Sequence, residues 1–336
     1  MSKRKAIPVG PGEKVFDVED EPMPRGAWWW WFWLFFFDNP KDPDRPRQLM
    51  ILWSAKNVRE IDCNGMKIKF RLPLDKNAMD GTVAAWYFDG ENMHHNFLLE
   101  HCMIKFSKDG ISTDSKTPTS FTVRDVSNRI RIGDNFDFAA DVRGECGFLR
   151  PAYHANNLLG SKGYAITRIN LLDLKGTVSG KPVKGTAYFQ RVFVNGPAVP
   201  WYWGIFHFAN GAVLTYTNQM VLKKAIKKKI AFFDGYGLHE LSDIKVKKTG
   251  GMIPEFEVSG ESREAKISFT VSAYAHSSWT FRKKSKRVIP NKLTYNEYPA
   301  VISDFEFVDK RTGKKTTLKE LGKAVGNAEH ATGYLF

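Results

Sequence analysis

Residues 201–217 read WYWGIFHFANGAVLTYT, two apolar runs rich in aromatic and β-branched residues that are joined by Asn210 and Gly211. An Asn-Gly pair between two such runs predicts a β-hairpin, because a type I′ turn needs two residues that tolerate positive φ. The two-residue period of a strand places alternate side chains of the first run on opposite faces. One of these faces carries Trp201, Trp203, Ile205 and His207.

The same kind of run, broken by short turns rich in Gly, Asp and Asn, recurs along the chain. This pattern is typical of sequential antiparallel strands. Such runs cover residues 48–55, 65–72, 81–88, 97–106, 120–126, 134–142, 163–174, 186–194, 201–209, 212–217, 229–233 and 265–275. One helical signal stands near the end, where Thr317 and Glu320 can form a capping box ahead of Leu318, Leu321 and Val325. We predict an all-β chain with one short C-terminal helix.

The chain has 336 residues, and 43% of them are apolar. This length and apolar content favour two domains. Near the start, Trp28–Phe37 is followed by the proline-rich segment Pro40–Pro46, which predicts an exposed loop and makes the aromatic run half of a hairpin. Farther on, the polar segment 151–161 precedes a fresh series of strands that begins at Gly163. We place the division there, with one β domain over residues 1–155 and a second over residues 156–336.

The net charge of +14 is concentrated late in the chain, in basic runs at 223–229, 282–287 and 310–315. One interpretation is that these runs are solvated loops that flank strands and block sheet edges. The other is peripheral contact with an anionic membrane surface. Nucleic-acid binding would need tryptophans exposed in a row beside the lysines; the tryptophans stand inside apolar strands, so we expect no nucleic-acid partner.

The compartment is indicated by what the sequence lacks. The longest apolar run, 27–37, is shorter than the roughly 20 residues that a membrane-spanning helix needs. The basic N-terminus has no apolar segment of a secretory signal behind it. Cys63, Cys102 and Cys146 are widely spaced and odd in number, which argues against a disulfide framework or a zinc knuckle. We expect a cytoplasmic protein.

Four stretches carry a family resemblance: NLLDLKGTVSGKPVKGTAYFQR at 170–191, PWYWGIFHFANG at 200–211, WWWW at 28–31 and ATGYL at 331–335. They resemble the tandem lipocalin-like family that includes carotenoid 1,2-hydratase (hydroxyneurosporene synthase), AttH-type proteins and, more distantly, fungal Diels–Alderases. The resemblance implies two lipocalin-like β-barrels or sandwiches, with an apolar ligand, often an isoprenoid, inside or between them. For the hydratases it also implies a buried acid that protonates a C=C bond, aromatic faces that stabilise the carbocation, and water that captures it.

The chain departs from the family at one segment. Many members carry an acidic or histidine-containing segment after the Gly-x-Ala-Tyr strand, whereas this chain has FQRVF at 189–193. Arginine stays charged and cannot donate a proton at neutral pH. Two functions therefore stay open: a hydro-lyase or isoprenoid cyclase, or a non-catalytic carrier of an isoprenoid or lipid-like molecule held in a β-barrel cavity.

The candidate catalytic residues are Glu100, as a buried acid, and His207. The candidate ligand-binding residues are Trp86, Tyr188, Arg191, Trp201 and Trp203. The alternatives are that the tryptophans are core packing, that His207 is a hydrogen-bonded core histidine, and that Arg191 either pairs with Glu100, Asp141 or Glu145 or projects outward from an edge strand.

Metal and cofactor sites find no support in the sequence. His95 and His101 share a strand face, but six residues of extended strand span about 20 Å, too far for one metal ion. No Gly-x-Gly-x-x-Gly, P-loop or Gly-x-Ser-x-Gly motif is present. We expect neither a metal nor a cofactor.

Overall fold

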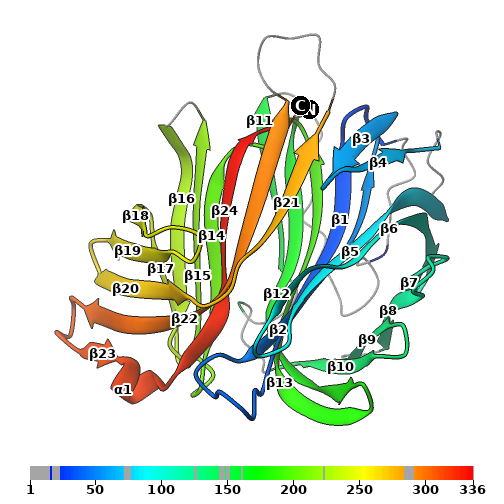
Figure 1. Ribbon diagram of the computed structural model, residues 1–336. Helices are drawn as coiled ribbons and strands as arrows, with labels where there is room; N and C mark the ends of the chain where they lie inside the picture. The colour runs from blue at the N-terminus through cyan, green and yellow to red at the C-terminus, as the bar shows by residue number, and fades with distance from the viewer. Residues whose placement is uncertain are drawn as a thin grey trace.

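The computed structural model describes residue 16, residues 23–71, 77–124, 127–143 and 148, the backbone of 152–159, and residues 162–221, 224–283 and 291–335. Its strands form two antiparallel sheets, of 11 and 13 strands, that lie side by side (Figure 1). Long strands from each sheet run next to each other through the middle of the molecule.

The first sheet has the order β10-β9-β8-β7-β6-β5-β2-β1-β13-β12-β11. β10 also pairs with β12, and this pairing closes the sheet into a barrel. Its strands are β1 (Trp28–Phe37), β2 (Arg47–Lys56), β5 (Ala78–Phe88), β6 (Met93–Ser107), β7 (Gly110–Thr113), β8 (Thr119–Arg124), β9 (Ser127–Ile132), β10 (Phe136–Val142), β11 (Ala152–Leu159), β12 (Lys162–Val178) and β13 (Lys181–Asn195).

The second sheet has the order β17-β16-β15-β14-β24-β22-β20-β19-β18, with β21, β23, β3 and β4 joined beside this path. The β3–β4 hairpin comes from early in the chain, yet it pairs with β21. The strands are β3 (Glu60–Cys63), β4 (Met66–Lys69), β14 (Trp201–Phe208), β15 (Val213–Val221), β16 (Lys224–Phe233), β17 (Leu238–Leu241), β18 (Asp243–Thr249), β19 (Glu255–Glu261), β20 (Ala265–Ala273), β21 (Ser277–Arg282), β22 (Lys292–Asp309), β23 (Lys315–Thr317) and β24 (Ala324–Tyr334).

The change from one sheet to the other lies between β13 and β14, at residues 196–200. This differs from the division expected near residue 155. The segment read as a polar connection forms β11, and β12 and β13 return to pair with β10 and β1. These long-range pairings keep residues 152–195 in the first sheet, so the expected boundary falls inside it.

The hairpin predicted around Asn210 and Gly211 is confirmed, with β14 antiparallel to β15. The turn type is not the predicted one. Of the two residues only Gly211 has a positive φ, at 90°, whereas a type I′ turn needs it at both. The Asn210 side chain instead accepts a hydrogen bond from the backbone N–H of Ala212 at 2.9 Å, which holds the turn by side-chain chemistry.

The predicted helix start is also confirmed. In α1 (Leu318–Leu321), Thr317 caps the N-terminus and Glu320 completes the capping box. The helix ends after one turn, at Gly322, whose φ of 76° stops the helical path. Val325 therefore lies in β24 rather than on the helix.

The aromatic strand β1 explains how the two sheets are joined. It is hydrogen-bonded to β2 and β13, and both of its faces are buried. Trp29, Trp31 and Trp33 point into the first barrel, while Trp28 and Phe32 belong to a separate cluster that includes residues of the second sheet. A strand covered on both faces requires a continuous apolar run rather than an alternating one.

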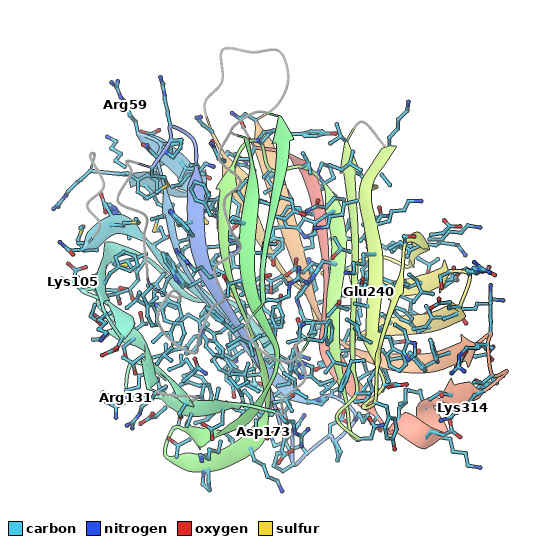
Figure 2. All side chains as sticks on the ribbon, turned by 180° about the vertical axis from the view of Figure 1, so that it is seen from behind. Arg59, Lys105, Arg131, Asp173, Glu240 and Lys314 are labelled. Atoms are coloured by element: carbon cyan, nitrogen blue, oxygen red, sulfur yellow. The ribbon has the colours of Figure 1, made fainter. Side chains whose placement is uncertain are left out.

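Many of the basic residues lie on the outside, whereas Lys56 and Arg191 are buried. Figure 2 shows the side chains of Arg59, Lys105, Arg131 and Lys314 directed away from the centre of the molecule. Several late lysines pair with glutamates, among them Lys310 with Glu261 and Lys247 with Glu257, and most of the basic run 282–287 lies outside the described residues. Membrane contact stays a prediction. Among the described residues, no helix has the length and apolar character to cross a membrane.

Candidate functional site

A row of four side chains crosses the face of the second sheet that is turned toward the first. Ser277 on β21 stands opposite Glu297 on β22, and Glu297 stands opposite Glu329 on β24. Glu329 in turn stands opposite Trp203 on β14. All four residues are buried. Neighbouring strands therefore bring two carboxyl groups together inside the protein.

Hydrogen bonds from aromatic side chains hold the two carboxyl groups. The Trp86 indole N–H, from the first sheet, donates to Glu297 Oε2 at 2.7 Å. The Trp201 indole N–H donates to Glu329 Oε2 at 2.9 Å, and the Tyr295 hydroxyl donates to Glu329 Oε1. The bond from Trp86 links the sheets, so the carboxyl pair lies at their interface.

Burial controls the protonation of this pair. Loss of solvent raises the pKa of Glu297 well above its usual value, and the neighbouring Glu329 carboxyl raises it further. Burial also raises the pKa of Glu329, against the opposing effect of the hydrogen bonds from Tyr295 and Trp201. The pair therefore retains a proton at neutral pH. Glu297 Oε2 accepts a hydrogen bond from Trp86. Glu297 Oε1 is therefore the oxygen of this residue that can donate the proton.

Aromatic rings surround the carboxyl groups. Trp203 packs against Tyr188 of the first sheet, with ring centroids 5.3 Å apart, and Trp201 packs against Tyr295 at 5.5 Å. The negative faces of such rings attract cations. The site thus combines a protonated carboxyl group with surfaces suited to a positively charged carbon.

The five predicted ligand-binding residues divide into two groups. Trp86, Tyr188 and Trp203 lie in the cluster between the sheets, and Trp201 packs against it. All four contact the carboxyl groups or each other: Trp86 and Trp201 donate to the carboxyl groups, and Tyr188 packs against Trp203. Arg191 lies elsewhere: its guanidinium stacks 4.3 Å from the centroid of the Trp29 ring, inside the first barrel. Because it follows Tyr188 by three residues, an odd number, it faces the opposite side of β13. Its 9% exposure shows that it does not project outward.

His207 shares the interface face of β14 but has a different environment from the carboxyl pair. Its Nε2 donates to the backbone carbonyl of Asn170 at 2.7 Å, so its Nδ1 accepts from the Thr186 hydroxyl at 2.8 Å. Burial lowers the pKa of His207 to about 4. The ring is therefore neutral at pH 7, with both nitrogens engaged by the protein, an arrangement that favours the core-histidine interpretation.

Glu100 lies on β6, in the first sheet, away from the carboxyl pair. Its carboxylate accepts hydrogen bonds from the backbone N–H groups of Lys116 and Thr117, at 2.6 and 3.3 Å. These hydrogen bonds hold the loop that contains Lys116 and Thr117 against β6. Its part in catalysis stays a prediction.

Other reactive groups are held in structural contacts. His101 bonds to Asp80 at 2.6 Å. Cys63 and Cys102 are buried, and burial raises the pKa of each thiol to about 12; Cys146 lies outside the described residues. Within the described part of the chain, no three His, Cys, Asp or Glu side chains gather as a metal site would require.

Sequence reasoning missed Glu297 and Glu329. One signal was available: Glu297 follows Leu293 and Tyr295 at two-residue spacing, so it lies on the same face as these apolar residues. A glutamate on an apolar strand face must be paired or protonated. Its cross-strand neighbour Glu329 carries no comparable local signal.

Comparisons with solved structures identify the fold. A putative AttH from Nitrosomonas europaea superposes with a TM-score of 0.60 at 13% identity, covering 98% of this chain and 100% of that one. The structure of CghA with Sch210972 superposes with a TM-score of 0.52 at 9% identity, covering 97% and 93%. No protein-family model matches the chain, and no curated protein does. The chain has the lipocalin-like fold of AttH-type proteins, and the predicted all-β fold class is confirmed.

Proposed function

We propose that this protein binds an apolar, isoprenoid-like molecule between its two sheets and protonates a C=C bond of that molecule from Glu297. The observation that carries the proposal is the buried carboxyl pair, Glu297 beside Glu329, enclosed by Trp86, Trp201 and Tyr295. A carboxyl group that stays protonated at neutral pH is the general acid such a reaction needs.

The chemistry follows from the contacts. The proton on Glu297 Oε1 forms a new C–H bond with one alkene carbon, using the π electrons, and the other carbon becomes a cation. The faces of Trp203 and Tyr188 and the Glu329 carboxyl stabilise this positive charge. Water then forms a C–O bond and returns its proton to Glu297, which gives hydration. Attack by a hydroxyl of the same molecule, whose proton passes to the Glu297 carboxylate, gives ring closure through a C–O bond. Attack by a second C=C bond gives ring closure through a C–C bond and a new cation, which loses a proton to the Glu297 carboxylate to form a C=C bond.

The fold comparison supports ligand binding in general terms. The CghA structure is one with Sch210972. The likeness to this chain is one of fold, so the kind of ligand must be argued from the side chains. Aromatic walls with a few polar atoms are typical of sites for apolar small molecules.

The test begins with solvent extraction of the purified protein, made in an isoprenoid-producing host, and mass spectrometry of the extract. The compound recovered is then incubated with the protein in D₂O. We expect a product with one new C–D bond. We expect the Glu297→Gln variant to bind the compound and form no product. Glu100→Gln is the matched variant, at the carboxylate in the first sheet, and is expected to keep the activity.

Three results would count against the proposal. Loss of activity in Glu100→Gln alone would move the acid to the first barrel. A compound recovered in stoichiometric amount but never deuterated would favour the non-catalytic carrier. An extract with no apolar compound, from repeated preparations in that host, would argue against a ligand between the sheets.

A further inference from the structure

Several polar atoms at the interface between the sheets have no hydrogen-bond partner among the described residues. They include both amide atoms of Asn327, Glu297 Oε1, Ser277 Oγ and Gln48 Oε1. All four residues are 0% exposed. Buried polar groups are nearly always paired, so each exception needs an explanation. Unpaired atoms of four residues on facing surfaces point to one common partner.

Strand geometry places these residues together. Ser277 and Glu297 stand opposite each other on β21 and β22. Asn327 precedes Glu329 by two residues on β24 and therefore shares its face. Gln48 reaches across from the first sheet, where its Nε2 donates to the Gly326 carbonyl at 2.8 Å. The unpaired atoms thus border the carboxyl pair from both sheets.

The chemistry of the atoms restricts the partner. The Asn327 side-chain N–H group and the Glu297 carboxylic acid can donate hydrogen bonds, so they require an acceptor. The Asn327 and Gln48 carbonyl oxygens only accept, so they require a donor. The Gln48 orientation is set by its Nε2, which also donates to the Tyr274 hydroxyl at 2.6 Å. A hydroxyl group supplies both donor and acceptor, whereas an ether or ketone supplies only the acceptor.

We infer that the ligand is an oxygenated apolar molecule, with a hydroxyl group close to the double bond that Glu297 protonates, rather than a pure hydrocarbon. This inference rests on the proposed function. Asn327 and Glu297 lie at diagonal positions on paired strands, where side chains are about 7 Å apart. The hydroxyl group is therefore within a few bonds of the reacting carbon. A hydrocarbon would leave the same polar atoms buried and unpaired.

The test uses three matched probes at each of three chain lengths. These are the prenyl alcohols geraniol, farnesol and geranylgeraniol, their methyl ethers, and the hydrocarbons of the same skeletons. Binding is measured by quenching of tryptophan fluorescence. We expect the best-fitting alcohol to bind at least tenfold more tightly than its hydrocarbon, with the ether between them, because a site built for a hydroxyl rejects analogues that lack it.

The variant Asn327→Leu separates recognition from stability. It is expected to weaken binding of the alcohol at least tenfold and to leave binding of the hydrocarbon unchanged or tighter. Asn128→Leu removes a buried hydrogen bond to Ala140 in the first barrel, at 3.0 Å, and controls for general destabilisation. It is expected to keep the preference for the alcohol.

Each contrary outcome has a distinct meaning. Equal binding of alcohol and hydrocarbon would overturn the inferred ligand class and leave the proposed function standing. Equal weakening of both probes in Asn327→Leu would show that Asn327 is structural and would also overturn it. Failure of every probe, at all three lengths, to bind would overturn the proposed function itself.

Discussion

The protonation of Glu297 can be tested without a substrate, through the pH dependence of stability. The variant is Glu297→Gln, which keeps the shape of the side chain and an oxygen to accept from Trp86. The folded protein raises the pKa of Glu297 well above the ordinary 4.5. Its contribution to stability is therefore complete at low pH, where folded and unfolded chains are both protonated. It is lost as pH rises, because the unfolded chain releases the proton first.

The size of the effect follows from linkage. Each proton that the folded state holds and the unfolded state does not lowers the free energy of unfolding by about 1.4 kcal/mol per pH unit. Between pH 5 and pH 7, one retained proton costs the wild type about 3 kcal/mol. In the variant, the side chain at position 297 holds no such proton. The slope of its unfolding free energy against pH should therefore be less negative by about 1.4 kcal/mol per unit.

The assay is urea unfolding, followed by circular dichroism, at pH 5, 6 and 7. Asn327→Leu alters the same interface without removing a titrating group, so it should shift the unfolding free energy by equal amounts at the three pH values. Equal slopes for wild type and Glu297→Gln would refute the reasoning, because Glu297 would then be ionised in the folded protein at pH 7.

Three further outcomes are expected. His207→Leu should lower the free energy of unfolding by about 2–3 kcal/mol, since both buried ring nitrogens are hydrogen-bonded. The same variant should leave the pH profile of turnover unchanged. A shifted pH profile would indicate a catalytic role for His207. Gly185→Ala should lower the free energy of unfolding by more than about 3 kcal/mol or prevent folding, because a Cβ at this position would stand 1.9 Å from the Phe36 carbonyl oxygen. Gly237→Ala is the control, since a Cβ there would have nothing within 4 Å. Equal melting temperatures for the two variants would contradict this expectation. Burial lowers the pKa of Lys56 to about 7, so between pH 7 and 10 the unfolded chain holds a proton that the folded chain has released. The stability of the wild type should therefore rise with pH over this range relative to Lys56→Met. A constant difference between their urea midpoints would be evidence against a neutral buried amine.

Local features of the fold could be predicted from the sequence. The hairpin at Asn210 and Gly211 and the capping box at Thr317 follow from contacts between residues a few positions apart. The two-residue period also placed Trp201 and Trp203 on the same face, where the structure has them. Such features depend on backbone geometry and on turn chemistry, which short stretches determine by themselves.

The tertiary structure alone decided where the first sheet closes and which carboxyl groups meet. The pairing of β10 with β12 retains residues 152–195 in the first sheet, and the register of β22 against β24 sets Glu297 beside Glu329. Register between strands far apart in sequence depends on how the whole apolar surface is buried, and a shift of one residue would turn each side chain to the other face. The alternation of residues determined which side chains could share a face, and sheet closure decided which of them meet.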